Sequence, residues 1–349
     1  MQTLRSLEDL EREGLVIPDP RLAAAAQAMA IAITPEMVRL IDRSDLANDP
    51  IARQFVPSIH ETAIAPEELA DPIGDEARSP VKGIVHRYPD RVLLKPLHVC
   101  PVYCRFCFRR EKVGPGGEAL SPAELDAALD YIRSHSGIWE VILTGGDPLM
   151  MAPRRLAELI QALDAIEHIA VVRIHSRVPI VDPGRMTNEL VAALKPKRAG
   201  LWLAVHCNHA RELNVETRAA LARLADAGIP LMGQTVLLAG INDDVDTLSE
   251  LMRALVRARV KPYYLHHPDL VRGTGHFRVP IERGQALMKE LRGRLSGLAQ
   301  PTYVLDVPGG HGKVPIGPRY LGDDPDALLI EDAFGGRHLY ADGSKDPSV

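Results

Sequence analysis

A repeated alternation of short apolar runs and amphipathic stretches fills the middle of the chain, from residue 91 to residue 307. The apolar runs have the length of buried strands, and apolar residues recur three and four positions apart in the stretches between them. Six strand–helix units and a seventh strand (302–307) fit this pattern. Strands separated by helices pair in parallel through right-handed crossovers, so the region is either a barrel or an open doubly wound sheet.

Polar side chains lie at the predicted carboxyl ends of successive strands. A barrel gathers these ends around one mouth, whereas an open sheet spreads them along an edge. We therefore predict an α/β fold, a partial (β/α)6 barrel of the TIM type. The polar residues are Cys100 to Cys107 after the first strand, Gly145 to Asp147 after the second, His175 and Arg177 after the third, His206 and Asn208 after the fourth, Gln234 on the fifth and Asp269 after the sixth.

The segments outside the repeat have a different character. Helix starts at Ser6 and Thr34 precede a stretch, 45–80, that is rich in proline and acidic residues, which predicts a helical and extended arm. Catalytic residues are not expected in this arm. The predicted regions are an N-terminal arm (1–80), the partial barrel (81–310), and a lysine-bearing loop with a C-terminal tail (311–349).

Three of the four cysteines, Cys100, Cys104 and Cys107, fall within eight residues after the first predicted strand. A structural zinc site needs four protein ligands, whereas three thiolates can hold an iron–sulfur cluster. The fourth cysteine, Cys207, lies far downstream, and a disulfide would leave one thiol over. The spacing CxxxCxxC, with Phe106 before the last cysteine, resembles the radical S-adenosylmethionine (SAM) signature. That resemblance implies a [4Fe–4S] cluster whose fourth iron binds SAM and whose electron releases a 5′-deoxyadenosyl radical.

The composition argues against several classes of protein. The net charge is −5 and no basic stripe is interleaved with aromatic residues, so a nucleic-acid partner is not expected. The apolar run 22–33 is too short to span a membrane, and the first ten residues lack the apolar core of a signal peptide. Few cysteines in a long chain favour a reducing compartment, so we expect a cytoplasmic protein.

The segment Gly145, Gly146 and Asp147 follows the second predicted strand. Glycines let backbone approach a ligand, although such a sequence can also form an ordinary turn between strand and helix. The radical SAM resemblance implies that this segment binds SAM. Further polar residues expected inside the barrel, on the SAM side or near another cofactor, are as often structural as functional; they are His175, His206 and Gln234.

A lysine between glycines, Lys313, follows the seventh strand. Its spacing alone is typical of a solvated lysine on a flexible loop. Together with the cysteine loop and the segments 86–93 and 262–278, however, this stretch resembles the lysine 2,3-aminomutase family, in order from about Asp71 to Tyr320. That resemblance implies that Lys313 forms a Schiff base with pyridoxal 5′-phosphate (PLP).

The same resemblance implies an isomerase that moves the α-amino group of L-lysine to the β-carbon. Radical migration of the amino group needs a π bond beside the nitrogen, which an imine with PLP supplies. Arg109 is implied to bind the substrate carboxylate, Asp269 and Asp306 the distal ammonium, and Arg87 and Arg91 the PLP phosphate. Without the resemblance, Arg109 would be a partner of the cluster loop and each aspartate a helix or turn cap.

The chain departs from the longer family members in two places. Asp244 stands where they carry a zinc-binding cysteine, so no zinc is expected, and His311 stands where the lysine loop has glycine. The short length resembles the branch that makes β-lysine for elongation factor P. Another amino acid such as glutamate or arginine, a protein-bound lysine, or a non-catalytic iron–sulfur or zinc module remain alternatives. An electron donor such as flavodoxin or ferredoxin and a homo-oligomer are expected partners.

Overall fold

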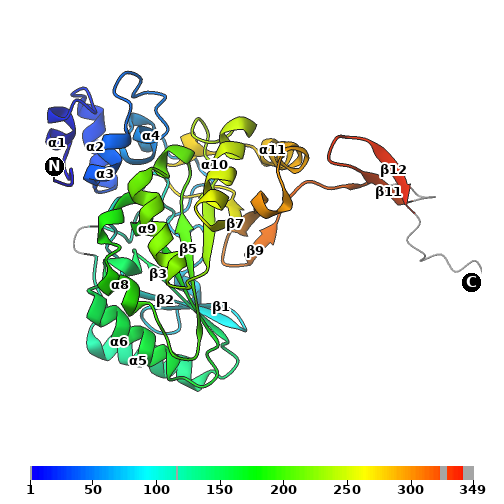
Figure 1. Ribbon diagram of the computed structural model, residues 1–349. Coiled ribbons are helices and arrows are strands. Elements are labelled where there is room, and N and C mark those ends of the chain that lie inside the picture. The colour runs from blue at the N-terminus through cyan, green and yellow to red at the C-terminus, as the bar shows by residue number, and fades with distance from the viewer. Residues whose placement is uncertain (1, 115–116, 323–327, 341–349) are drawn as a thin grey trace, which may run out of the picture.

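The computed structural model describes residues 2–114, 117–322 and 328–340, and its centre is a curved nine-stranded sheet (Figure 1). The strands follow one another in chain order, which confirms the predicted partial barrel. Strands β2 to β8 are parallel, while β1 and β9 pair antiparallel at the two edges. The strands are β1 (Ile84–Tyr88), β2 (Arg91–Leu97), β3 (Glu140–Gly145), β4 (Val171–Ser176), β5 (Gly200–His206), β6 (Leu231–Val236), β7 (Val260–His266), β8 (Thr302–Val307) and β9 (Gly312–Pro315).

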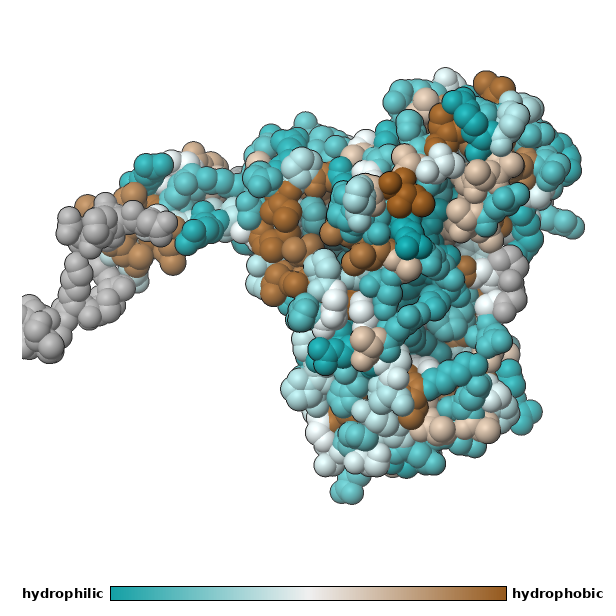
Figure 2. Space-filling model, turned by 180° about the vertical axis from the view of Figure 1, so that it is seen from behind, coloured by the Kyte–Doolittle hydropathy of each residue, from teal (hydrophilic) through white to brown (hydrophobic). Residues whose placement is uncertain are grey.

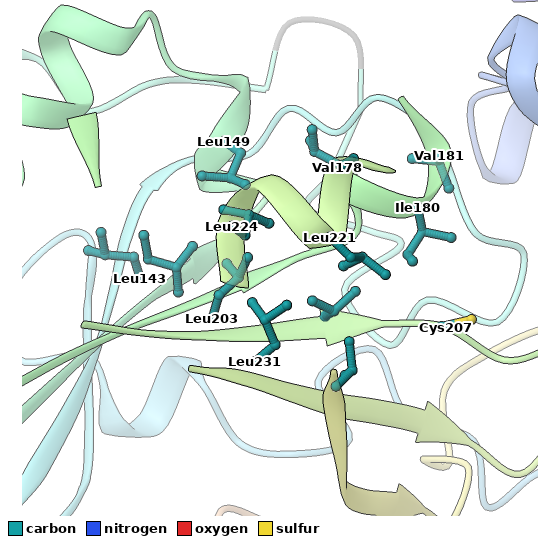
Figure 3. Close-up of a cluster of buried hydrophobic side chains, with 14 of the residues drawn as sticks. Leu143, Leu149, Val178, Ile180, Val181, Leu203, Cys207, Leu221, Leu224 and Leu231 are labelled. Carbon is teal, nitrogen blue, oxygen red and sulfur yellow. The ribbon is translucent and has the colours of Figure 1, made fainter. Parts of the chain in front are cut away.

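Helices connect the parallel strands and cover the outside of the sheet (Figure 1). The capping box that begins at Ser121 starts the first of them, and Gly228, with φ +79°, follows the end of α9. Figure 3 shows Leu143 and Leu203 of the sheet among the buried side chains that include Leu221 of α9. The connecting helices are α5 (Pro122–Ser134), α6 (Pro153–Asp164), α7 (Val178–Val181), α8 (Asn188–Ala193), α9 (Val215–Asp226), α10 (Val245–Arg257) and α11 (Ile281–Arg294).

The two antiparallel edge strands bring the ends of the sheet together. Lys313, expected on a loop, lies on β9 instead, because glycines with positive φ at 309, 310 and 312 turn the chain back along β8. The backbone N–H of Lys313 donates a hydrogen bond of 2.6 Å to the Tyr88 hydroxyl on β1. This contact links the opposite edges and nearly closes the barrel.

The N-terminal arm packs against the barrel rather than wrapping loosely around it (Figure 1). Its buried residues Leu10, Met37 and Phe55 belong to the same hydrophobic cluster as the strands. The predicted helix starts are confirmed, since Ser6 and Thr34 are the N-cap residues of α1 and α3. The arm helices are α1 (Leu7–Arg12), α2 (Pro20–Ala28), α3 (Pro35–Leu40) and α4 (Ala52–Phe55).

The C-terminal segment forms a separate three-stranded sheet that projects from the barrel (Figure 1). None of the residues in its strands is buried. Figure 2 shows hydrophobic side chains on the surface of this projection, and Leu339 is 75% exposed. Its strands are β10 (Leu321–Gly322), β11 (Leu328–Glu331) and β12 (Arg337–Tyr340). No helix in the described ranges is long and apolar enough to cross a membrane.

Candidate active site

A cavity of about 570 Å³ lies at the carboxyl ends of the barrel strands. It is lined by every residue to which the sequence assigned a catalytic, metal-binding, cofactor-binding or substrate-binding role, so segments more than 200 residues apart meet there. The individual roles remain predictions. These residues are Arg87, Arg91, Cys100, Cys104, Phe106, Cys107, Arg109, Gly145, Gly146, Asp147, His175, His206, Gln234, Asp269, Asp306 and Lys313.

The three loop cysteines are free thiols that line this cavity. Burial raises the pKa of Cys100 well above its usual value, and it raises the pKa of Cys107 to about 11. Thiolates in this environment therefore need a positive partner, which iron supplies. Among the described residues no three His, Cys, Asp or Glu side chains are arranged for a single metal ion. Three free thiols on one loop are a donor set that can hold an iron–sulfur cluster.

The N-terminal arm fixes the cysteine loop through a buried ion-pair group. Arg105, fully buried inside the loop, donates hydrogen bonds of 2.9 and 2.6 Å to Glu61 of the arm and further bonds to the backbone carbonyls of Ala25 and Met29. Arg110 donates a bond of 2.6 Å to the same carboxylate. One arm carboxylate thus balances two arginines that flank Cys107. No local sequence pattern indicates this group.

Asp75 of the arm contacts two arginines that line the cavity, a supporting role that the sequence did not indicate. Its carboxylate accepts hydrogen bonds from Arg109 at 3.0 Å and Arg87 at 3.1 Å, and the ammonium of Lys95 lies 3.6 Å away. Burial opposes ionisation of Asp75, but Arg109, Lys95 and Arg87 outweigh it and hold its pKa below the usual value. Asp75 therefore stays ionised and orients two of the predicted ligand-binding arginines.

A glycine permits this approach of the arm. A Cβ on Gly74 would lie 2.7 Å from the backbone nitrogen of Gly310, in the hairpin that carries Lys313. The φ of Gly74 is also positive, at +65°. The sequence does show a glycine directly before Asp75. A single glycine, however, does not reveal which distant segment it contacts.

A second group of charged side chains in the cavity consists of two carboxylates, Asp269 and Asp306, and Lys313. The Lys313 ammonium forms an ion pair with Asp306, its cross-strand neighbour on β8. Burial and then the nearby Asp306 charge raise the pKa of Asp269 to about 7. Lys313 is therefore held by a carboxylate, which excludes the solvated lysine on a flexible loop that its spacing alone suggested.

Three partly buried histidines on the cavity wall are neutral, and one of them has an unsatisfied nitrogen. Burial, as the largest cause, lowers the pKa of His175, His206 and His266 well below the usual value. His206 Nε2 lies 3.1 Å from Asn208 Oδ1, whereas His175 Nε2 has no hydrogen-bond partner in the described chain. An unpaired buried nitrogen on the cavity wall fits a polar group of a bound cofactor.

The Gly-Gly-Asp segment is shaped by its own chain. A Cβ on Gly146 would lie 2.4 Å from the carbonyl oxygen of Val99, so a larger residue would collide with the start of the cysteine loop. The Asp147 carboxylate accepts hydrogen bonds from the Ser176 hydroxyl and from the backbone N–H groups of Leu149, Arg177 and Val178. Any contact of this segment with SAM is therefore left to its backbone, because the carboxylate is already saturated.

Comparisons with known proteins agree with this arrangement. Residues 94–252 match the model of the Radical SAM superfamily, and residues 288–336 match the Lysine-2,3-aminomutase model. L-lysine 2,3-aminomutase of Clostridium subterminale is 43% identical over 300 residues, covering 86% of this chain and 72% of that protein. The Fusobacterium nucleatum enzyme of the same name is 42% identical and covers 95% and 78%.

A relative with another substrate in its name is glutamate 2,3-aminomutase of Clostridioides difficile, 39% identical over 83% of this chain and 68% of that protein. Among solved structures, Streptococcus suis SuiB bound to S-adenosylmethionine has a TM-score of 0.47 and 14% identity, covering 63% of this chain and 51% of that chain, a likeness too weak to bear on function. Identity to the aminomutases over most of the chain is decisive. The chain belongs to the lysine 2,3-aminomutase family of radical SAM isomerases, whose cofactors are a [4Fe–4S] cluster, SAM and PLP.

Proposed function

We propose that this enzyme converts free L-lysine to β-lysine by moving the α-amino group to the β-carbon. The observation that carries the proposal is the pair Asp269 and Asp306 in the same cavity as Arg109 and Lys313. Two carboxylates suit the distal ammonium of lysine. Glutamate would instead bring a third carboxylate beside them, and like charges in a buried site are costly.

The two ends of the substrate have separate partners in this proposal. Arg109 binds the α-carboxylate through its planar guanidinium, with Asp75 fixing its Nε side. A lysine inside a protein chain lacks that carboxylate, which favours the free amino acid. The distal ammonium takes a place beside Asp269 and Asp306 and competes there with the Lys313 ammonium for Asp306.

The cofactors are assigned to the remaining residues. Cys100, Cys104 and Cys107 hold the cluster, and Lys313 holds PLP, with Arg87 and Arg91 for its phosphate. When bound, SAM and the cluster supply a hydrogen-abstracting radical, and PLP supplies the π bond beside the substrate nitrogen.

The test is anaerobic incubation of the cluster-loaded enzyme with SAM, PLP, dithionite and one amino acid at a time: L-lysine, L-glutamate, L-arginine or L-lysinamide. We expect β-lysine from L-lysine. The other three compounds should give turnover lower by about 100-fold or more, an effect of roughly 2.7 kcal/mol. Equal turnover of glutamate, or of lysinamide, would contradict the assignment of one end of the substrate.

Variants and pH separate the roles of the acidic pair. Asp269→Ala and Asp306→Ala should each lower kcat/KM for lysine by about 100-fold, because removing one partner leaves a buried charge unpaired. Since the pKa of Asp269 is about 7, KM for lysine should fall as pH rises from about 6 to 8 and the carboxylate ionises. Unchanged lysine turnover in both variants would show that the pair does not select the substrate.

A further inference from the structure

Arg177 packs against the cysteine loop and forms a hydrogen bond with one of its sulfur atoms. The side chain is 6% exposed, and its Nη1 donates a hydrogen bond of 2.8 Å to Cys104 Sγ. The guanidinium lies 4.7 Å from the centre of the Phe55 ring and 5.6 Å from that of Phe106. A permanent positive charge thus reaches a cysteine of the cluster signature from a dry, aromatic surrounding.

The position of this guanidinium is fixed by partners that do not depend on the cysteine. Its Nη2 donates to Glu212 Oε2 at 2.9 Å and to Gln54 Oε1 at 2.5 Å. Glu212 is fully buried, and its other oxygen accepts the backbone N–H groups of Asn208 and His209. The barrel and the arm therefore both hold Arg177 through Nη2, while Nη1 donates to the loop cysteine.

We propose that Arg177 sets the reduction potential of the [4Fe–4S] cluster by stabilising the Cys104 thiolate in the reduced state. Reduction adds one electron and therefore one negative charge to the cluster and its three thiolates. A hydrogen bond and a nearby positive charge favour that more negative state, and hydrogen bonds to the sulfurs are known determinants of cluster potential. Glu212 balances the charge of Arg177, but it binds the far side of the guanidinium, so the donor facing Cys104 dominates.

A second buried arginine, on the strand that ends directly before Arg177, provides a matched control. Arg173 on β4 is 8% exposed, lines the same cavity, and donates to Glu140 at 3.0 Å. No hydrogen bond is recorded between its guanidinium and a cysteine among the described residues. Substitution of Arg173 therefore removes an equivalent buried ion pair from the strand without removing a donor to the cluster.

The experiment is an anaerobic redox titration of the cluster-loaded enzyme, in which dithionite supplies the electron and the reduced [4Fe–4S]⁺ state is counted by electron paramagnetic resonance. The variants are Arg177→Met, Arg177→Gln, Arg177→Lys and Arg173→Met, each first assayed for iron and sulfide per chain. At the potential where the wild-type cluster is half reduced, the ratio of reduced to oxidised cluster should fall at least tenfold in Arg177→Met and Arg177→Gln. That change equals 59 mV for a one-electron couple. Arg177→Lys, which keeps the charge, and Arg173→Met should stay within threefold of wild type.

Each other outcome overturns the proposal. A loaded Arg177→Met or Arg177→Gln cluster with the wild-type ratio would show that the contact leaves the potential unchanged. An equal shift in Arg173→Met would show a general effect of losing a buried cation. Failure of both uncharged variants to retain the cluster, while Arg177→Lys retains it, would make Arg177 a requirement for binding rather than a determinant of potential.

Discussion

The two ends of the chain differ in burial and in their contact with the site. The N-terminal arm shares the hydrophobic core of the barrel and sends Glu61 and Asp75 to the cysteine loop and the cavity. The C-terminal sheet has no buried strand residue and exposes Phe334 and Leu339 by 86% and 75%. Both ends lie outside the strand–helix repeat, but only the arm contacts residues of the cavity. The boundaries of the repeat therefore do not show which flanking segments support the site.

Burial explains why the arm cannot be separated from the site. The arm contributes carboxylates that balance arginines inside the cysteine loop and beside the cavity, and buried charges of this kind are stable only when paired. The C-terminal sheet contributes no described residue to the lining of the cavity. Changes at arm contacts should therefore alter both stability and the site, whereas changes on the C-terminal sheet should alter neither.

The largest expected effect comes from Glu61→Ala. The change leaves Arg105 and Arg110 buried without their shared carboxylate, so we expect the free energy of unfolding to fall by about 3–5 kcal/mol. Chemical denaturation of the cluster-free protein measures this loss. Glu13→Ala, which removes a more exposed arm ion pair with Arg43, is the control and should cost about 1 kcal/mol or less. Equal losses of unfolding free energy in the two variants would mean that the Glu61 ion pairs stabilise the protein no more than an exposed ion pair does.

A smaller effect is expected from Gly74→Ala, where the arm meets the lysine hairpin. The added Cβ would lie 2.7 Å from backbone of Gly310, and the backbone is already left-handed, so we expect a loss of roughly 2 kcal/mol and weaker PLP binding. Gly14→Ala has nearly the same φ, +66°, but no atom within 4 Å of its Cβ. It therefore carries the backbone strain alone.

Absorbance titration with PLP and denaturation of both glycine variants separate strain from contact. If Gly14→Ala and Gly74→Ala lose the same stability and bind PLP equally well, the contact between arm and hairpin has no consequence. A loss of PLP affinity confined to Gly74→Ala would show that the arm shapes the Lys313 hairpin.

The sequence predicted the features that depend on neighbouring residues and missed those that depend on contacts between distant segments. The strands, the capping box at Ser121 and the cysteine spacing are local patterns, and the structure has each of them in place. The cavity residues at the strand ends followed from strand order, because the carboxyl ends of a barrel meet, whereas Arg87, Arg91, Arg109, Asp306 and Lys313 followed only from the family resemblance. Asp75 and Glu61 were missed because their contacts join segments 34 and 44 residues apart with no repeat or motif between them.

The edge strands were missed for a related reason. β1 and β9 are short and lie outside the alternation of strands and helices, and glycines around Lys313 are as typical of a loop as of a tight hairpin. Only the pairing of Asp306 with Lys313 across β8 and β9 distinguishes the two. A charged pair of this kind can be identified once the register is known, which a single sequence does not provide.

Asp75→Asn tests the arm within the site itself. Asparagine keeps the size of the side chain but loses the charge that holds Arg109 and Arg87, so we expect kcat/KM for lysine to fall about tenfold, or roughly 1.4 kcal/mol, chiefly through KM. Steady-state kinetics with lysine measure it. Asp45→Asn, an exposed arm carboxylate bonded only to Asn48 among its recorded side-chain partners, should leave both constants unchanged. Wild-type kinetics in Asp75→Asn would reduce the arm to a structural support.

The smallest effect is expected from Leu339→Ser on the C-terminal sheet. Leu339 is already 75% exposed, so its replacement removes little apolar contact and should change the free energy of unfolding by less than about 0.5 kcal/mol. The measurement is denaturation at two protein concentrations about 100-fold apart. A loss above about 1 kcal/mol that appears only at the higher concentration would mean that another chain covers this sheet, because only association makes stability depend on concentration. In that case the two ends of the chain would differ in which molecule buries them rather than in whether they are buried.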